Sequence, residues 1–207
     1  MTRDDSLVVA GVDPGTCAEG PHRRFALWLQ GCTLACPGCC NPELFDADAG
    51  RRRNVSEVLT EITAAPGGVE GVTVVGGEPL QQLPALTRLL AGVAASGLGV
   101  LVFTGYEPDE ARALPGFDAL WQCCDTLVAG RFDARRRDGA PAFVGSRNQT
   151  LLHRTTRYAA DALWQGPPMA ELVVEPDGRV RLVGAPSTGL ALARALAGPR
   201  ALRLADA

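Results

Sequence analysis

Four cysteines stand within nine residues of this chain, and their spacing is the feature that most restricts what it can fold into. Cys32, Cys36 and Cys39 follow a C-x3-C-x2-C pattern, and Cys40 comes directly after the third. Thiolates at such spacing can surround one metal centre, either an iron–sulfur cluster or a zinc ion, and both usually take four ligands. Three cysteines on a cubane cluster would leave one iron without a protein ligand, which suits a catalytic centre.

A structural zinc ion is the main alternative, and it would need a fourth ligand from the protein. Cys17 or Cys40 could supply it, but a second spaced pair is not found, because Cys123 and Cys124 are adjacent. The two histidines lie in no ligand-like spacing. The spacing alone therefore favours an iron–sulfur cluster over zinc and leaves both open.

The composition predicts one globular domain, since the chain has 207 residues, of which 46% are hydrophobic and 21% charged. The net charge of −3, without a basic tail, gives no support to binding of nucleic acid or of a membrane surface. The first residues, MTRDDSLVVAGVDPG, resemble neither a signal peptide nor a membrane span. We therefore expect a cytoplasmic protein whose seven cysteines serve metal or redox chemistry rather than disulfides.

Short apolar runs rich in β-branched residues predict strands buried on both faces, as in a parallel sheet. The runs are 72–75, 100–103, 25–29 and 126–129. Helices fit between them. One should begin at Asn54, which forms a capping-box pattern with Glu57; a second should cover residues 81–96 and stop at Gly97; a third should begin near Pro108. The alternation predicts an α/β fold made of βαβ units.

Polar and glycine residues follow two of these strands, at the sheet edge where ligands bind in such folds. Gly76-Gly77-Glu78-Pro79 follows the first strand and Thr104-Gly105-Tyr106 ends the second. Two glycines there expose backbone carbonyls, which could accept hydrogen bonds from an ammonium group. An ordinary strand-exit turn would use the same glycines. Residues 130–145 read as a polar loop, in which Arg135-Arg136-Arg137 is more typical of a solvated face than of a phosphate site.

The C-terminal part predicts a hairpin over 171–183, with Asp177-Gly178 as a two-residue turn, and a helical tail from Ser187.

Together these motifs resemble one family, the radical S-adenosylmethionine (SAM) enzymes, and within it the small activating proteins of glycyl-radical enzymes, particularly those of anaerobic ribonucleotide reductase. The matching segments are GCTLACPGCCNPE at 31–43, GGEP at 76–79, TGY at 104–106, LVAGRF at 127–132 and GSRNQ at 145–149, with GPHR at 20–23 as a looser match. Cys40 departs from the family pattern, which often has an aromatic residue or a histidine at this position.

The resemblance implies an open radical SAM β/α barrel with parallel strands over residues 1–160, extended by the hairpin and helix at 161–207. It implies a [4Fe-4S] cluster on Cys32, Cys36 and Cys39. It also implies SAM binding at the sheet edge, with Glu78 as a structural partner rather than a base. The residues assigned to SAM in this way are Gly76, Gly77, Glu78, Thr104, Tyr106 and Asn148.

The implied activity is reductive cleavage of SAM to a 5′-deoxyadenosyl radical, which takes a hydrogen atom from a glycine of a partner enzyme such as anaerobic ribonucleotide reductase. The implied partners are a glycyl-radical enzyme and an electron donor of the flavodoxin or ferredoxin type. Two alternatives remain. One is a radical SAM enzyme acting on a peptide or small metabolite, and the other is a non-catalytic module that binds an iron–sulfur cluster or zinc.

Overall fold

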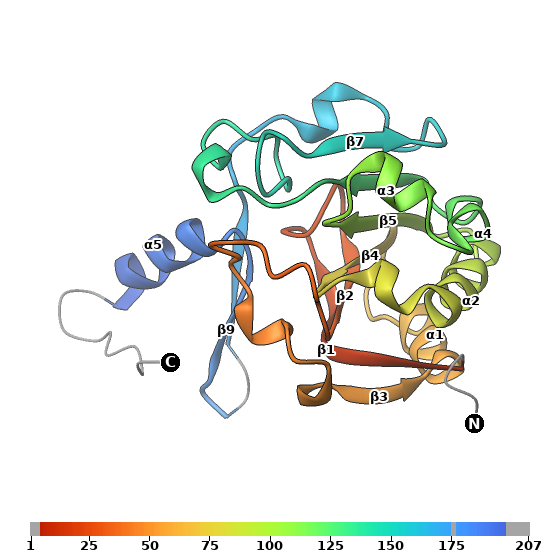
Figure 1. Ribbon diagram of the computed structural model, residues 1–207. Coiled ribbons are helices and arrows are strands. Elements are labelled where there is room, and N and C mark those ends of the chain that lie inside the picture. Colours follow the sequence, from red (N-terminus) through yellow and green to blue (C-terminus); the bar gives the residue numbers. More distant parts are fainter. Residues whose placement is uncertain (1–4, 175–176, 198–207) are drawn as a thin grey trace.

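The computed structural model describes residues 5–174 and 177–197, which form a seven-stranded sheet, helices along one face of it and a C-terminal hairpin (Figure 1). The strand order is β3-β1-β2-β4-β5-β6-β7. Four neighbouring strands are parallel: β2 (Arg24–Leu29), β4 (Gly71–Gly76), β5 (Gly99–Thr104) and β6 (Thr126–Ala129). They contain the four predicted runs, so the α/β fold with an open, mostly parallel sheet is confirmed.

Helices α1 (Val55–Thr63), α2 (Leu83–Ala95), α3 (Pro108–Arg112) and α4 (Phe117–Trp121) occupy the connections between these strands. In α1, Glu57 accepts hydrogen bonds from the backbone and side-chain amides of Asn54, as the capping-box pattern predicts. Helix α2 ends before Gly97, whose φ of +80° favours glycine. It begins two residues later than predicted, because Pro79–Gln82 forms a separate 3-10 helix.

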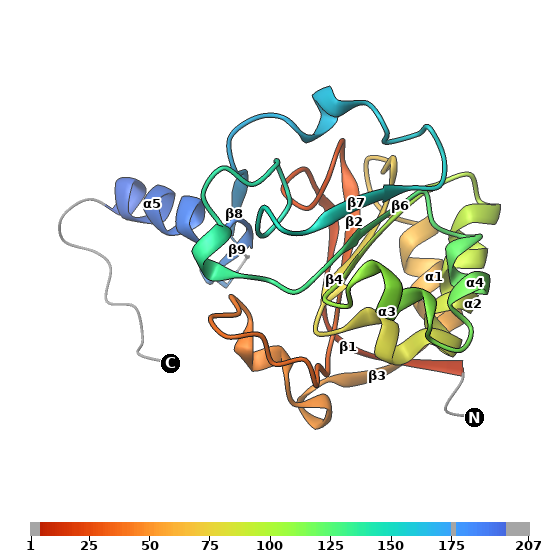
Figure 2. The same cartoon turned by 45° about the horizontal axis from the view of Figure 1, so that its top comes forward.

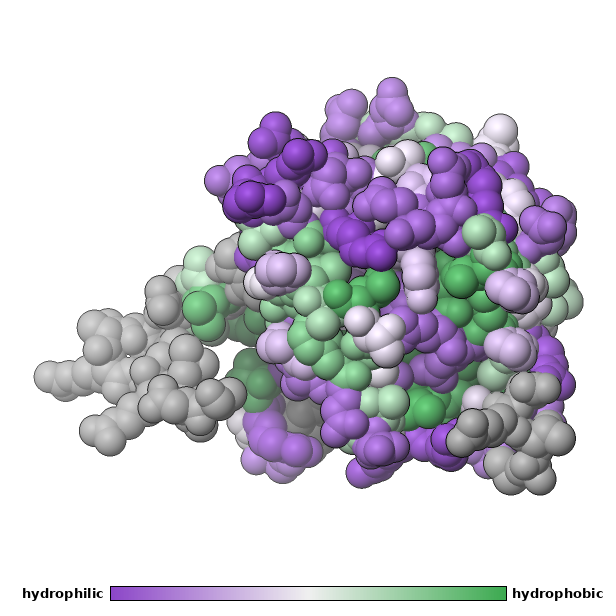
Figure 3. Space-filling model, in the orientation of Figure 1, coloured by the Kyte–Doolittle hydropathy of each residue, from purple (hydrophilic) through white to green (hydrophobic). Residues whose placement is uncertain are grey.

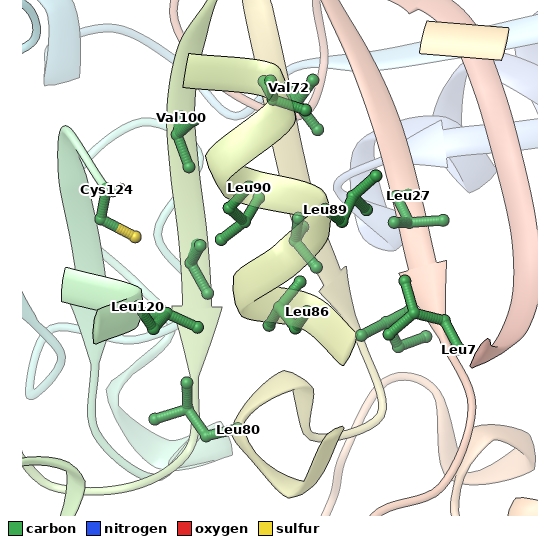
Figure 4. Packing of buried hydrophobic residues seen from close by; sticks show 14 of the residues in the cluster. Leu7, Leu27, Val72, Leu80, Leu86, Leu89, Leu90, Val100, Leu120 and Cys124 are labelled. Carbon is green, nitrogen blue, oxygen red and sulfur yellow. The ribbon is translucent and has the colours of Figure 1, made fainter. Parts of the chain in front are cut away.

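The main core lies between this helical layer and the sheet. Leu86, Leu89 and Leu90 of α2 are fully buried, and Figure 4 shows this helix lying over the strands that carry Leu27, Val72 and Val100. A second, smaller cluster fills part of the other face of the sheet. It consists of Leu101, Val128, Val144, Tyr158 and Trp164. Both faces of the parallel strands are therefore covered, as their continuous apolar sequence predicts.

Three antiparallel strands complete the sheet, and the sequence did not predict any of them. They are β1 (Ser6–Thr16), β3 (Arg51–Asn54) and β7 (Thr150–His153). Strand β1 pairs with β2 on one side and β3 on the other, while β7 pairs with β6 at the opposite edge. The predicted loop at 130–145 is confirmed except for a short 3-10 helix at Ala134–Arg136.

The hairpin consists of β8 (Ala170–Val174) and β9 (Val180–Gly184), and α5 (Pro186–Ala197) follows it. The last described strand pair is Val174 with Val180, and Asp177-Gly178 lies beside residues 175–176, which are outside the described residues, so the two-residue turn stays a prediction. The hairpin is predicted correctly, and so is the helical start of the tail; residues 198–207 lie outside the described part of the chain. Figure 2 shows the hairpin on the side of the sheet opposite α1, α2 and α4.

Side chains near the end of β1 hold the hairpin in place. Glu171 accepts hydrogen bonds from the Thr16 hydroxyl at 2.6 Å and from the backbone N–H of Cys17 at 2.9 Å. Arg181 forms an ion pair with Asp13 at 2.8 Å. These contacts join segments that are more than 150 residues apart in the sequence.

In the described part of the chain, no helix is both long and apolar enough to span a bilayer.

Candidate metal centre and cofactor cavity

A cavity of about 710 Å³ lies between the sheet face that carries no helices and the hairpin. Its sheet side includes Trp28, Val75 and Phe103, which lie near the carboxyl ends of β2, β4 and β5. Its opposite side includes Met169 and Leu182 of the hairpin region. The cavity thus lies at the sheet edge where ligands were expected.

Cys32, Cys36 and Cys39 all line this cavity, together with Cys40. The loop that carries them leaves β2 and is fixed at its base, where the N–H of Cys32 donates to the carbonyl of Phe45 at 3.1 Å. Within the loop, the N–H of Cys39 donates to the carbonyl of Cys36 at 3.1 Å, which closes a tight turn. The three regularly spaced thiols therefore open onto one space, and the loop is held by backbone hydrogen bonds.

The thiols differ in their acidity. A hydrogen bond from the Cys40 thiol lowers the pKa of Cys39 to about 6, and the same bond, together with burial, raises the pKa of Cys40. Burial also raises the pKa of Cys36. The thiols of Cys39 and Cys40 are therefore close enough to affect each other's acidity.

Among the described residues, no three His, Cys, Asp or Glu side chains converge on a point suited to a single metal ion. A cubane cluster does not need such convergence, because three cysteines bind three different irons. The donor set fits the cluster: three thiols face a shared cavity, which Gly76 and Gly77 also line.

Gly76 ends β4 and Gly77 follows it, and both lie beside the start of the cysteine loop. A Cβ on Gly76 would stand 2.4 Å from the carbonyl oxygen of Leu29, and one on Gly77 would stand 2.4 Å from that of Gly31. The N–H of Gly77 donates to the Leu29 carbonyl at 2.7 Å, and the N–H of Glu78 donates to the Gly31 carbonyl at 2.8 Å. Glycine is required at these two positions because the backbones approach too closely for any side chain.

Glu78 is buried and joins the ends of two neighbouring strands. Its carboxylate accepts hydrogen bonds from the Thr104 hydroxyl at 2.7 Å and from the backbone N–H groups of Leu80 and Gly105 at 2.9 and 2.7 Å. Burial raises the pKa of Glu78 even though these bonds act against it. The geometry is that of a structural partner. Both Glu78 and Thr104 line the cavity, but their polar atoms serve each other.

Tyr106 and Asn148 do not line the cavity. The Tyr106 hydroxyl accepts a 3.3 Å hydrogen bond from Gln81, and its ring packs against the main core and carries the Arg131 guanidinium 5.7 Å from its centroid. Asn148 donates to the carbonyl of Arg131 at 2.7 Å, and its buried Oδ1 has no partner. A role in SAM binding for these two residues stays a prediction.

The sequence reading missed the contribution of the hairpin and of Glu19 to the cavity. Glu19 lines it beside Ala18 and accepts a 3.0 Å hydrogen bond from the N–H of Gly184. Burial raises the pKa of Glu19 to about 7, and the carboxylates of Asp13 and Glu171 add to this shift. No local motif marks these contacts, because the hairpin and β1 are far apart in the chain.

Comparison with known proteins gives one family match, to the model described as "4Fe-4S single cluster domain", over residues 18–152. The anaerobic ribonucleoside-triphosphate reductase-activating protein of Escherichia coli K12 is 29% identical over 150 residues, which cover 68% of this chain and 94% of that protein. The pyruvate formate-lyase-activating enzyme of Staphylococcus epidermidis is 39% identical over 119 residues, covering 53% of this chain and 47% of that enzyme.

Among solved structures, QueE from Escherichia coli aligns with a TM-score of 0.41 and 16% identity, over 48% of this chain and 53% of QueE. The chain therefore spans about half the length of QueE and of the staphylococcal enzyme. The family match contains every cysteine of the cavity and both Gly76 and Gly77 at the end of β4. The chain belongs to the 4Fe-4S single cluster domain family and is a radical SAM enzyme related to the glycyl-radical activases, with a [4Fe-4S] cluster and SAM as its cofactors.

Proposed function

We propose that this protein activates a glycyl-radical enzyme, with anaerobic ribonucleotide reductase as the first candidate. The observation that carries the proposal is the single cavity onto which the three spaced thiols and the Gly76-Gly77 backbone both open. The likeness to the Escherichia coli activating protein, which extends over 94% of that protein, favours this target class.

In this proposal Cys32, Cys36 and Cys39 hold the cluster. When bound, the cluster supplies the electron for reductive cleavage of SAM and an open iron for its amino and carboxylate groups.

The protein's own groups bind and orient SAM. Among the described residues, none donates a hydrogen bond to the carbonyl of Gly77, so this oxygen is free to accept one from the ammonium of SAM. Glu78 and Thr104 fix the two strand ends that carry the SAM contacts. They need not move a proton, because their polar atoms are already paired. Apolar side chains such as Trp28 and Phe103 exclude water from the reaction space.

Anaerobic incubation of the reconstituted protein with SAM and dithionite tests the first half of the proposal. We expect 5′-deoxyadenosine and methionine in equal amounts, measured by liquid chromatography with mass spectrometry. Addition of the glycyl-radical enzyme from the same organism tests the second half. The expected result is a glycyl-radical signal in electron paramagnetic resonance, and its absence despite SAM cleavage would exclude this target.

A second candidate, modification of a peptide or small metabolite, is favoured by one observation. The cavity wall contains Met169, Leu182 and Gly184, which lie beyond the family match at 18–152. A wall built from residues outside that match would allow a different substrate to be selected. SAM cleavage without a radical on the glycyl-radical enzyme would favour this reading.

A further inference from the structure

A basic segment lies directly against the outer side of the cysteine loop. A Cβ on Gly38 would stand 3.1 Å from the Cβ of Ala134, so the 3-10 helix Ala134–Arg136 approaches the loop closely at this point. Phe132, two residues before Ala134, lines the cavity together with Cys36. Any molecule that binds this segment is therefore placed next to the residues that hold the cluster.

The cysteine loop separates the cavity from a second hollow on the protein surface, of about 950 Å³. Cys36 and Cys39 line the cavity, whereas Pro37 and Gly38 between them line the hollow. Arg131, Arg135 and Arg136 also line the hollow, together with the carboxylates of Glu107 and Asp133. A partner seated here would contact the loop from outside and leave the cavity accessible to SAM and substrate.

The charge of this segment is opposite to that of the chain. Residues 131–147 contain five arginines and two aspartates, while the whole chain has a net charge of −3. Asp133 pairs with Arg135 at 3.1 Å and with Arg136 at 3.5 Å, yet their side chains remain 89% and 59% exposed. The segment, green to turquoise in Figure 1, lies beside the orange cysteine loop, and Figure 3 shows hydrophilic residues gathered over that region.

We propose that the hollow formed by Pro37, Gly38, Arg131, Arg135 and Arg136 is the docking surface for an acidic one-electron carrier protein. The inference rests on the proposed function, because a radical SAM enzyme needs an electron from outside. Electron-transfer encounters are small and transient, and opposite charges raise their association rate. In the step itself one electron passes from the reduced carrier to the cluster. The carrier is oxidised by one electron and the cluster is reduced by one electron.

The double variant Arg135→Glu/Arg136→Glu tests this surface. The probes are a reduced flavodoxin and a reduced plant-type ferredoxin, both acidic, and stopped-flow absorbance gives the second-order rate constant for cluster reduction. We expect this constant to fall at least about tenfold at low ionic strength and the difference to shrink at high salt, since the attraction is screened. Affinity of each oxidised carrier for the protein, measured by calorimetry, should fall in parallel.

The matched control is Arg52→Glu/Arg179→Glu, which changes the net charge equally at exposed arginines on β3 and on the hairpin connection. Dithionite should reduce the cluster of both double variants as in the parent and support 5′-deoxyadenosine formation. Failure of that reaction would count against the proposed function rather than the docking surface. Equal losses in both double variants, or no loss in the first, would overturn the docking proposal. Normal reduction by the carriers with lost affinity for the glycyl-radical enzyme would also overturn it.

Discussion

The two ends of the parallel sheet are built from opposite chemistry. At the carboxyl ends, glycine backbones, thiols and apolar side chains surround a cavity. At the amino ends, Arg24 is fully buried and all of its nitrogens are engaged. Its donors reach the Thr73 hydroxyl at 2.6 Å, the carbonyls of Val72 at 2.8 Å and Pro21 at 3.2 Å, Glu70 at 3.0 Å and the Tyr158 hydroxyl at 2.8 Å.

The amino end is thus a polar network whose groups satisfy one another. Burial acts to raise the pKa of Glu70, but hydrogen bonds from Tyr158 and Arg157 and the charge of Arg24 outweigh it, and the net pKa is lowered. Tyr158 also donates to Glu70, and its ring lies 4.7 Å from the Arg24 guanidinium. One end of the sheet is closed by saturated hydrogen bonds, while the other keeps acceptors available for a ligand. The difference predicts that mutations should separate stability from cofactor binding.

The largest expected effect is loss of the cluster at the carboxyl end of the sheet, which we call the open end. Cys32→Ala, Cys36→Ala and Cys39→Ala should each abolish cluster assembly, because each removes a thiolate ligand. Cys40→Ala, the matched control beside them, should retain its iron, since Cys40 lies outside the C-x3-C-x2-C set. Iron content and absorbance after anaerobic reconstitution measure both results. Loss of iron from the Cys40 variant, with retention in one of the others, would overturn the ligand assignment.

Gly77→Ala should have the next largest effect, again at the open end. The added Cβ meets the Gly31 carbonyl oxygen at 2.4 Å, so the backbone after β4 or that of the cysteine loop must shift. We expect the Kd for SAM to rise at least about tenfold, which corresponds to about 1.4 kcal/mol. Gly11→Ala is the control, because no atom lies within 4 Å of its added Cβ. SAM affinity of Gly77→Ala equal to that of the parent would remove these glycines from the site.

Replacing each of the two tyrosines of the chain compares the amino end of the sheet with the carboxyl end. Tyr158→Phe removes a buried hydroxyl that bonds to Arg24 and Glu70, and should lower the free energy of unfolding by about 1–2 kcal/mol without changing SAM affinity. Tyr106→Phe removes only a 3.3 Å exposed hydrogen bond to Gln81 and should leave stability within about 0.5 kcal/mol. Urea unfolding of both variants measures the difference. Equal losses of stability would show that the amino-end network has no special weight.

The elements that could be predicted from the sequence are those whose burial leaves a pattern in the local sequence. The four parallel strands and helix α2 could be predicted because burial on both faces leaves a continuous apolar run and a helical stripe. Strand β3 could not, since Arg51-Arg52-Arg53-Asn54 is entirely polar and forms only by pairing with β1. Strand β1 contains Gly11, Pro14 and Gly15, which signal turns rather than a strand.

The candidate site divides in the same way. Its cysteines and glycines lie in short local motifs, and the structure brings them to one cavity. Tyr106 and Asn148 were assigned by motif as well, but a motif gives chain position and not side-chain direction, and the structure places both outside the cavity lining. The hairpin wall depends on contacts such as Glu171 with Thr16, 155 residues apart, which local sequence does not encode.

The smallest expected effect comes from replacing Glu19, a carboxyl at the carboxyl end of the sheet that keeps a raised pKa. Its carboxyl lines the cavity near Asp13 and Glu171, and Arg181 supplies the nearby positive charge through its ion pair with Asp13. The ordinary pKa is 4.5 and the folded value is about 7, so between these values the folded state binds more protons than the unfolded state. The contribution of Glu19 to the free energy of unfolding therefore falls as pH rises through that window.

Glu19→Gln should remove this dependence, because the amide is neutral at every pH and can still accept from Gly184. The variant should be about 1 kcal/mol more stable than the parent near pH 8, less than the full shift would give because solvent reaches part of the side chain. Near pH 5 the difference should be smaller. Denaturant unfolding of both proteins at the two pH values measures it. A difference that is the same at both would show that Glu19 keeps an ordinary pKa, and that the cavity wall is as well solvated as the outer surface.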